Sequence, residues 1–224
     1  MNGQVLEWGV ATLALPGEAE SGDLHLFEPF KDGALVAVVD GLGHGGEAAV
    51  AAKAAVAALK KHPQESVITL VRRCHEDLRA TRGAVLSMAA FNALDGTMTW
   101  LGVGNVEGIL LRADSEGKPK GPTQWPRFPA LIPAEPSRTR PPYESLLLRR
   151  GVVGGRLPPL YATILPVARG DTLILVTDGI RSGYEPRVTP RAIPQQTADQ
   201  ILKQHNTETD DALVFVGRYV GNSQ

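Results

Sequence analysis

The stretch that organises this chain reads Val36-Ala37-Val38-Val39-Asp40-Gly41-Leu42-Gly43-His44-Gly45-Gly46-Glu47. Its first part is short, rich in β-branched residues and continuously apolar, which predicts a strand buried on both faces. Asp40 ends that strand, a glycine-rich turn follows, and an alanine-rich helix is predicted from Glu47 onward. A carboxylate at the end of a buried strand needs a cation or backbone donors as its partner.

Three interpretations of this stretch compete. Gly41, Gly43 and Gly46 match the G-x-G-x-x-G pattern of a dinucleotide-binding turn, after a strand and before a helix. Against it, Asp40 would face the pyrophosphate, and residues 60–63 (Lys-Lys-His-Pro) occupy the place of the expected acidic strand end. The second interpretation is a metal site with Asp40 as a ligand, and the third is a tight turn capped by a carboxylate. The stretch alone leaves the choice open.

Composition sets further limits. The chain has 224 residues, 43% of them hydrophobic, which is enough for the core of one large domain. Its net charge of −1 predicts no nucleic-acid partner and no attraction to an anionic membrane. The single cysteine, Cys74, excludes an intrachain disulfide and a cysteine-based zinc site. No signal peptide or spanning segment is recognisable, so a cytoplasmic protein is expected.

Apolar periodicity and turn residues predict a strand-rich chain with few helices. The predicted strands cover residues 5–15, 24–27, 34–39, 84–93, 98–103, 106–112, 145–148, 160–167, 172–176 and 212–219. The predicted helices cover residues 47–61, 64–81 and 197–203. Residues 113–143 interrupt this pattern with eight of the 17 prolines, and Trp125 and Phe128 lie among them. We expect this segment to be an irregular insertion.

Acidic residues fall at the ends of four predicted strands. Asp23 begins one strand and Asp40 ends the next, so an antiparallel hairpin would bring both carboxylates to the same end. Asp178 follows the strand 172–176 and precedes a glycine, as Asp40 does, and Asp210-Asp211 precede the last strand. Carboxylates that converge cannot all stay ionised without cations. Oxygen ligands without histidine or cysteine suit Mg²⁺ or Mn²⁺.

Five ordered motifs carry a family resemblance. They are Gly22-Asp23, Asp40-Gly41-Leu42-Gly43-His44-Gly45, Gly104-Asn105-Val106-Glu107-Gly108, Gly170-Asp171-Thr172-Leu173 with Thr177-Asp178-Gly179, and Asp210-Asp211-Ala212-Leu213. Their succession resembles the PPM-type metal-dependent serine/threonine phosphatases, and within them the SpoIIE-like branch. The resemblance covers essentially the whole chain, and it is strongest to stand-alone phosphatases of the stressosome.

The resemblance implies an α+β fold, a β-sandwich of two antiparallel sheets flanked by helices in α-β-β-α layers. Residues 1–224 would form a single phosphatase domain with the proline-rich insertion around 113–143. The implied activity is hydrolysis of phosphoserine or phosphothreonine on partner proteins, with phosphorylated STAS-domain stressosome proteins as the expected substrates. No small-molecule redox cofactor is expected.

The resemblance also implies a site with two divalent cations, Mn²⁺ or Mg²⁺. Asp40 would bridge both ions, with Asp23 and the Gly41 carbonyl completing one of them. Asp178 and one of Asp210 and Asp211 would hold the other. Because adjacent strand residues point to opposite faces, only one of that pair can be a ligand of this ion. By resemblance Asp210 is that ligand, and Asp211 secures the turn.

His44 is the remaining candidate for chemistry. Its ordinary pKa suits donation of a proton to the leaving serine or threonine oxygen. A role as an ordinary helix-entry residue is the alternative for His44. For the whole chain, two other functions stay open: a non-catalytic binding module of the same fold, and a dinucleotide-binding oxidoreductase.

Overall fold

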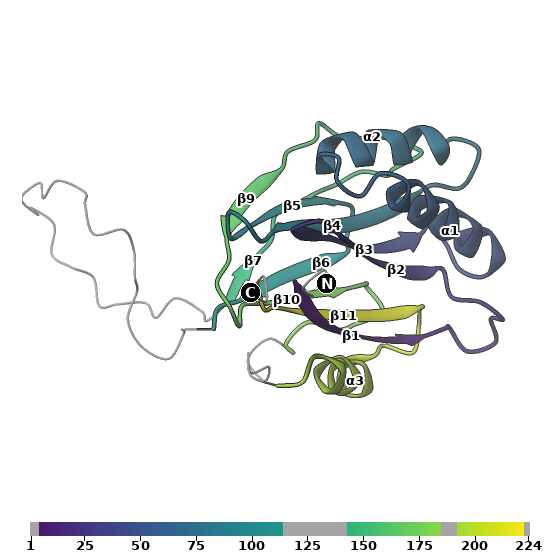
Figure 1. Cartoon of the computed structure of the whole chain (residues 1–224). Coiled ribbons are helices and arrows are strands. Elements are labelled where there is room, and N and C mark those ends of the chain that lie inside the picture. The colour runs from purple at the N-terminus through teal and green to yellow at the C-terminus, as the bar shows by residue number, and fades with distance from the viewer. Residues whose placement is uncertain (1–4, 114–142, 185–191, 222–224) are drawn as a thin grey trace, which may run out of the picture.

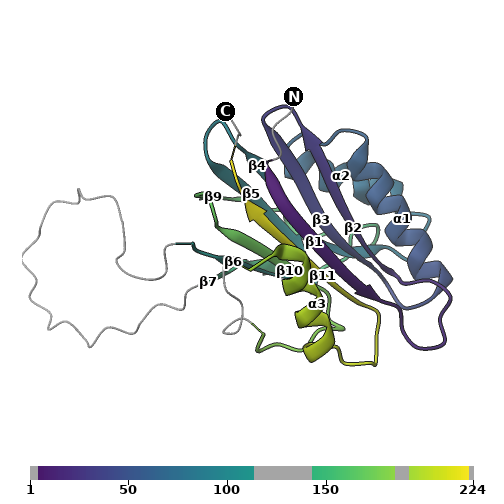
Figure 2. The same ribbon diagram turned by 60° about the horizontal axis from the view of Figure 1, so that its bottom comes forward.

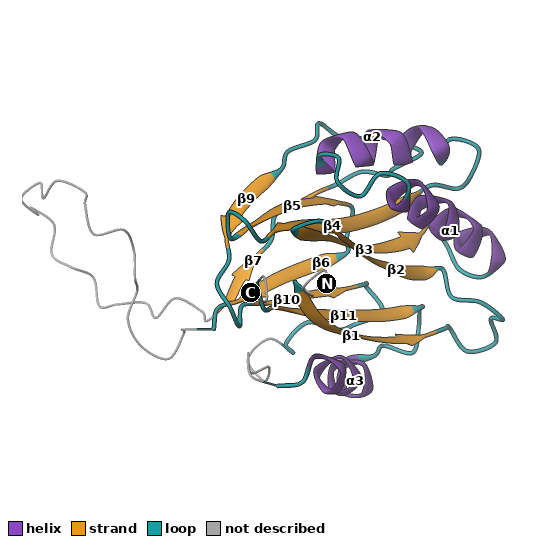
Figure 3. Cartoon of the chain, viewed as in Figure 1, coloured by secondary structure: helices purple, strands orange, loops and turns teal. Residues whose placement is uncertain are grey.

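The structure is a computed structural model, and it describes residues 5–113, 143–184 and 192–221. Two β-sheets pack face to face, helices α1 (Gly46–Lys60) and α2 (Val67–Asp77) cover one of them, and α3 (Pro194–His205) covers the other. Figure 1 shows these four layers from the side, and Figure 3 separates helices from strands in the same view. The predicted α+β fold with α-β-β-α layers is confirmed.

The sheet under α1 and α2, here the β3 sheet, has its strands in the order β2-β3-β4-β5, with β8 and β9 both on the outer edge of β5. Its strands are β2 (Asp23–Phe30), β3 (Gly33–Gly41), β4 (Ala84–Asn92), β5 (Thr97–Val103), β8 (Leu148–Arg149) and β9 (Thr163–Pro166). All these pairs are antiparallel except β5–β8, which is parallel. The expectation of purely antiparallel sheets therefore has one short exception.

The second sheet, here the β10 sheet, is antiparallel throughout, with the order β1-β11-β10-β6-β7. Its strands are β1 (Leu6–Leu13), β11 (Ala212–Tyr219), β10 (Thr172–Val176), β6 (Glu107–Leu111) and β7 (Tyr143–Ser145). Figure 2, in which the bottom of the molecule comes forward, shows α3 in front of this sheet, where it packs on β1 and β11. The edge strands β1 and β2 lie on the same side of the sandwich, because Trp8 of β1 contacts the rings of His25 and Phe27 in β2.

Strand β3 has the two buried faces that its sequence predicted. Val36 and Val38 belong to the core between the sheets, while Leu35, Ala37 and Val39 pack under the helices. Helix α1 packs closely against the end of β3 because residue 41 is a glycine. A Cβ at Gly41 would lie 2.1 Å from the carbonyl oxygen of Ala48. Strand β3 runs antiparallel to both β2 and β4. The dinucleotide-binding alternative is therefore wrong, since that turn belongs to a parallel βαβ unit.

The single strand predicted over residues 145–148 is wrong. The chain crosses from the β10 sheet to the β3 sheet at this point, because β7 ends at Ser145 and β8 begins at Leu148. The Leu146 amide donates to Gly108 in β6, and the Trp100 indole in β5 donates to the carbonyl oxygen of Leu147. Leu146 and Leu147 thus make hydrogen bonds to different sheets. An alternation of apolar and polar residues in the sequence could not indicate this.

Other boundaries moved by a few residues. The helix predicted over 64–81 is shorter, because the Ser66 side chain caps the amide of Thr69 and α2 ends at Asp77. The strand predicted over 160–167 is reduced to β9, and the helix predicted over 197–203 extends to α3. The proline-rich segment 113–143 lies outside the described residues except for its two end residues. None of the helices in the described ranges is long and apolar enough to cross a membrane.

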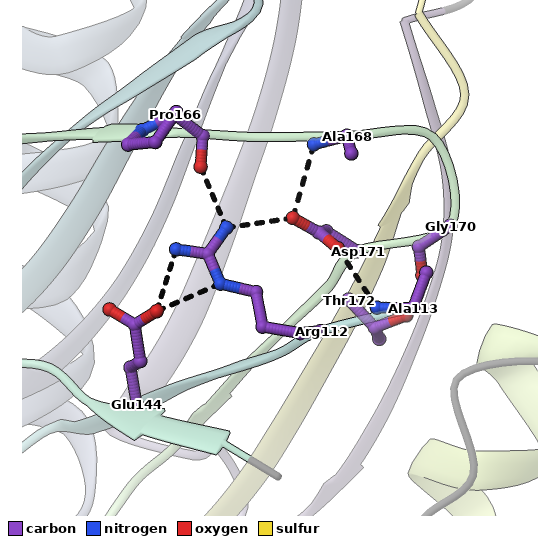
Figure 4. A network of polar contacts seen from close by, with 8 residues as sticks. All are labelled: Arg112, Ala113, Glu144, Pro166, Ala168, Gly170, Asp171 and Thr172. Atoms are coloured by element: carbon purple, nitrogen blue, oxygen red, sulfur yellow. Dashed lines mark hydrogen bonds and ion pairs between the residues drawn. The ribbon is translucent and has the colours of Figure 1, made fainter. Parts of the chain in front are cut away.

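One end of the sandwich is held by a polar network around Asp171, which is only 3% exposed (Figure 4). Asp171 accepts hydrogen bonds from Arg112 at 2.8 Å, from the amide of Ala113 at 2.9 Å and from the amide of Ala168 at 3.1 Å. Arg112 also donates to Glu144 at 2.8 Å. The motif Gly170-Asp171-Thr172-Leu173 therefore has a structural role, away from the strand ends that carry the other acidic residues.

Candidate active site

Two carboxylates face each other at one end of the β3 sheet. Asp23 and Asp40 are directly paired in the antiparallel β2–β3 register, as the predicted hairpin required. Asp23 is 3% exposed and Asp40 is half-buried. The amide of Gly41 donates to the carbonyl oxygen of Gly22 at 3.0 Å, so the two chain segments stay together past the end of the pair.

The β10 sheet brings its own acidic residues to the same end. Thr177 and Asp178 directly follow β10, and Asp210 and Asp211 lie before β11. The Thr177 hydroxyl donates to Asp23 at 2.7 Å and accepts from the amide of Leu213 at 2.8 Å. This buried hydroxyl joins the two sheets where their acidic strand ends meet. The carboxylates predicted from four separate strand ends are therefore gathered at one end of the sandwich.

Asp210 and Asp211 have different environments. Asp211 is buried, and its two carboxylate oxygens accept the amides of Leu15 at 2.8 Å and Gly22 at 2.7 Å. Asp210 is exposed, and one of its oxygens accepts the amide of Asp211 at 2.8 Å. The side chain of Asp211 thus ties the β1–β2 loop to the start of β11, while Asp210 is the member of the pair that is open to solvent.

Burial and mutual repulsion perturb these carboxyl groups. Burial, and then the charges of Asp23 and the other acidic residues, raise the pKa of Asp40 to about 8. Burial raises the pKa of Asp23 to about 7, against the hydrogen bond from Thr177, which lowers it. The pKa of Asp178 is also raised, first by burial and then by the charge of Asp210. A bound cation would stabilise these carboxyl groups, because it favours their charged forms, which burial disfavours.

The donor set fits a hard divalent cation. It consists of carboxylate oxygens and backbone carbonyls, with no cysteine and no histidine among the converging residues. Within the described ranges, no three carboxylate, imidazole or thiol groups form a finished ligand cage. The carboxylates instead surround the end of the sandwich at positions from which they still raise one another's pKa.

His44 lies in the glycine turn between β3 and α1, and its side chain is exposed. Its Nδ1 is 2.7 Å from a carboxylate oxygen of Glu18, in the β1–β2 loop. With Nδ1 protonated toward Glu18, Nε2 is left as the nitrogen that can exchange a proton. The guanidinium of Arg82 lies against the same turn, because a Cβ on Gly43 would come within 2.8 Å of it, and Arg82 also pairs with Glu47.

In the sequence, Asn105 stood out only as part of the motif Gly104-Asn105-Val106-Glu107-Gly108. Gly104 does adopt a left-handed conformation with a φ of 104°, and it packs against Val85. Asn105, however, donates from its amide nitrogen to Asp178 at 2.7 Å and so orients that carboxylate. Thr177 was visible only as part of the Thr177-Asp178-Gly179 motif. For Thr177 the available signal was a polar residue directly beside a strand-end aspartate, whereas Asn105 lies 73 positions from Asp178 and had only its place in the motif.

Comparison with known proteins supports the same conclusion. No family model matches the chain. The PP2C phosphatase domain of SpoIIE from Bacillus subtilis has the same fold, with a TM-score of 0.73 and 18% identity over all of this chain and 66% of that one. The chain therefore has the fold of the PP2C, or PPM-type, phosphatases.

The more specific likeness is to RsbX. The phosphoserine phosphatase RsbX of Bacillus subtilis (strain 168) is 24% identical over 204 residues, which are 89% of this chain and 87% of RsbX. A crystal structure of RsbX with magnesium has a TM-score of 0.76 and 21% identity, over 96% of this chain and 95% of that one.

A chain from a study of the bacterial stressosome as a modular system controlling secondary messenger signalling has a TM-score of 0.79. It is 26% identical, over 96% of this chain and 100% of that one. In sequence and in fold, the chain is thus similar to the PPM-type phosphatases and, among them, to RsbX.

Proposed function

We propose that this phosphatase hydrolyses phosphoserine or phosphothreonine on partner proteins and depends on two divalent cations. The observation that carries the proposal is the pairing of Asp23 with Asp40 at the end of the sandwich where Asp178 and Asp210 also lie. The likeness to a phosphoserine phosphatase supports the reaction, and the magnesium in the related RsbX crystal structure supports the type of cation.

The proposed ligands are Asp40 for both cations, Asp23 and the Gly41 carbonyl for one, and Asp178 and Asp210 for the other. Asp211 is proposed to support this set without binding metal, because both of its oxygens already accept backbone amides. When bound, the cations supply positive charge that polarises the phosphoryl group and favours deprotonation of water. The carboxylates must release their protons for this, which links metal binding to pH.

The chain's own residues then orient the reacting groups. Thr177 holds the Asp23 carboxylate toward the junction of the sheets, and Asn105 holds Asp178. His44, oriented by Glu18, is proposed to give a proton to the leaving serine or threonine oxygen. No protein nucleophile is required, which is consistent with a buried Cys74 whose pKa is raised to about 12 by burial.

The proposed substrates are phosphorylated STAS-domain proteins of a stressosome in the cytoplasm. The support is the likeness to RsbX and to a chain from a study of the bacterial stressosome. We further propose that residues 1–224 form one phosphatase domain, with residues 113–143 as an insertion.

The test measures release of phosphate from p-nitrophenyl phosphate and from phosphoserine and phosphothreonine peptides by the purified chain. We expect turnover with Mn²⁺ or Mg²⁺ and none after exhaustive chelation with EDTA. Undiminished turnover without metal would exclude the two-cation mechanism. Metal binding without hydrolysis of any phosphoester would favour the alternative of a binding module.

A further inference from the structure

An arginine and a tyrosine are stacked on the outer edge of the β3 sheet. The guanidinium carbon of Arg149 in β8 lies 4.7 Å from the centre of the Tyr161 ring. Leu148 turns into the core between the sheets, so Arg149 points to the opposite, outer face. Tyr161 is 60% exposed and leaves one edge of this pair open to solvent. Cation–π stacking of this kind holds a long cationic side chain in a defined place.

The surface around this pair combines apolar and cationic groups. Ile164 in β9 is 67% exposed and pairs with Thr99 of β5. Arg149 pairs with Val103, which lies four residues after Thr99 on the same strand. Ile164 and Arg149 therefore lie on the same outer face. Arg150 and Arg156 are also exposed on the segment that joins β8 to β9. In the described ranges these three arginines have no acidic partner, unlike Arg82 and Arg112.

Hydrogen bonds and apolar contacts attach the segment between β8 and β9 to the rest of the β3 sheet and its helices. Val153 makes two hydrogen bonds of 2.9 Å with Ala84 at the start of β4, and the amide of Gly154 donates to His75 in α2 at 2.9 Å. Leu157 and Leu160 pack against the core beneath the helices. A rigid arginine and an exposed tyrosine are the residue types that carry most binding energy in protein interfaces.

The surface is also continuous with the candidate active site. The carbonyl oxygen of Arg149 accepts the amide of Gly104 at 2.8 Å, and the next residue, Asn105, binds Asp178. Ala84, to which the joining segment is bonded, pairs with Gly41 beside Asp40. A polypeptide that presents a phosphorylated residue to the acidic strand ends would therefore pass close to this edge.

We propose that Arg149, Tyr161 and Ile164, with Arg150 and Arg156 beside them, form a docking surface for an acidic segment of the phosphoprotein substrate. The inference rests on the proposed function, and it specifies the substrate class. The argument is charge complementarity: the arginines have no acidic partner within the described part of the chain, whereas the site itself is lined by carboxylates that repel an anionic protein. The apolar Tyr161 and Ile164 would contact the peptide between its acidic side chains.

The test compares two synthetic phosphoserine peptides that differ only in their flanks, which carry Asp and Glu in one and Asn and Gln in the other. We expect wild type to prefer the acidic peptide in kcat/KM, and Arg149→Ala to reduce that preference about tenfold, mainly through KM. Tyr161→Ala should act in the same direction. Lys203→Ala on α3 removes an exposed positive charge from the other side of the molecule and serves as the matched control.

A binding experiment separates this inference from the proposed function. The unphosphorylated acidic peptide, labelled with a fluorophore, is titrated with metal-free protein and followed by anisotropy. Weaker binding by Arg149→Ala than by Lys203→Ala, with a difference that shrinks at high ionic strength, would support the docking surface even if no phosphoester were hydrolysed. Equal binding by both variants, or an unchanged peptide preference, would overturn it.

Discussion

Thr177 and Asp23 are joined by a 2.7 Å hydrogen bond across 154 positions of sequence. Thr177 follows the central strand of the β10 sheet, and Asp23 begins the edge strand of the β3 sheet. This buried contact sets how the two sheets meet at their acidic ends, and it lowers the pKa of Asp23 against the effect of burial.

Replacing Thr177 tests this junction. Thr177→Val keeps the shape but removes the hydroxyl, so Asp23 loses a donor and the amide of Leu213 loses an acceptor. We expect the free energy of unfolding to fall by about 1–3 kcal/mol, the cost of buried unpaired polar groups. Half-maximal activity should also need more metal, because Asp23 holds its proton more tightly. Thr177→Ser retains the hydroxyl and should behave like wild type in urea unfolding and metal titration.

Asp40→Asn should abolish activity. Asp40 is the proposed ligand of both cations, so its replacement should lower metal-dependent turnover at least about 100-fold. That factor is the upper range for losing a supporting residue of a metal site. The metal-free variant should fold and, above about pH 8, be at least as stable as wild type, because at that pH it removes a half-buried charge from a set that repels itself. Circular dichroism and chemical denaturation check the second expectation. A variant that keeps wild-type turnover would remove Asp40 from the ligand set.

Asp210 and Asp211 should differ when each is changed to asparagine. Asp210→Asn should raise the Mn²⁺ concentration for half-maximal activity by about tenfold or more. Asp211→Asn should leave that concentration nearly unchanged but lower stability, because one amide oxygen cannot accept from both Leu15 and Gly22. We expect a loss of about 1–3 kcal/mol in urea unfolding. The opposite order in a metal titration would transfer the ligand role to Asp211.

Stability without metal should fall as pH rises. Asp23 and Asp40 have pKa values of about 7 and about 8 in the folded chain, against 3.8 as the ordinary value. Folded protein therefore holds these protons more tightly than unfolded protein, and the resulting stability is complete below about pH 4 and is lost as pH rises through about 7 and 8. In EDTA, we expect a lower Tm at about pH 8.5 than at about pH 6.

Two comparisons check that explanation. Asp40→Asn should make the decline of Tm with pH shallower, because one of the two groups no longer titrates. Mg²⁺ or Mn²⁺ should raise Tm more at the higher pH, where the carboxylates bind metal without first losing protons. A metal-free Tm that rises across this range would contradict the pKa shifts of both residues.

Asp171 should matter for stability and not for chemistry. Asp171→Ala leaves the amides of Ala113 and Ala168 without their acceptor and removes one partner of Arg112 (Figure 4). We expect unfolding to become easier by about 3 kcal/mol, as for a broken buried ion pair. Glu144→Gln removes the more exposed partner and should cost less than about 1 kcal/mol. Turnover per folded molecule should stay unchanged in Asp171→Ala, since Thr172 lies at the far end of β10 from Asp178.

The sequence by itself determined the features that depend on neighbouring residues. The apolar run before Asp40 indicated a strand with two buried faces, and the short connection from Asp23 indicated a hairpin, because both follow from local periodicity and turn chemistry. Repetition of an aspartate followed by glycine at a second strand end, Asp178, indicated a shared site. The order of five motifs then indicated the family.

Only the tertiary structure decided how the parts meet. The bonds of Asp211 to Leu15 and Gly22, of Thr177 to Asp23 and of Asn105 to Asp178 each join residues far apart in the chain. The crossing from β7 to β8 is likewise set by the packing of the two sheets, and the stacking of Arg149 on Tyr161 is set by the pairing of β8 and β9 with the same strand, β5. Such contacts depend on the relative placement of two whole sheets, which many weak non-local contacts determine together, and no local pattern of residues encodes that placement.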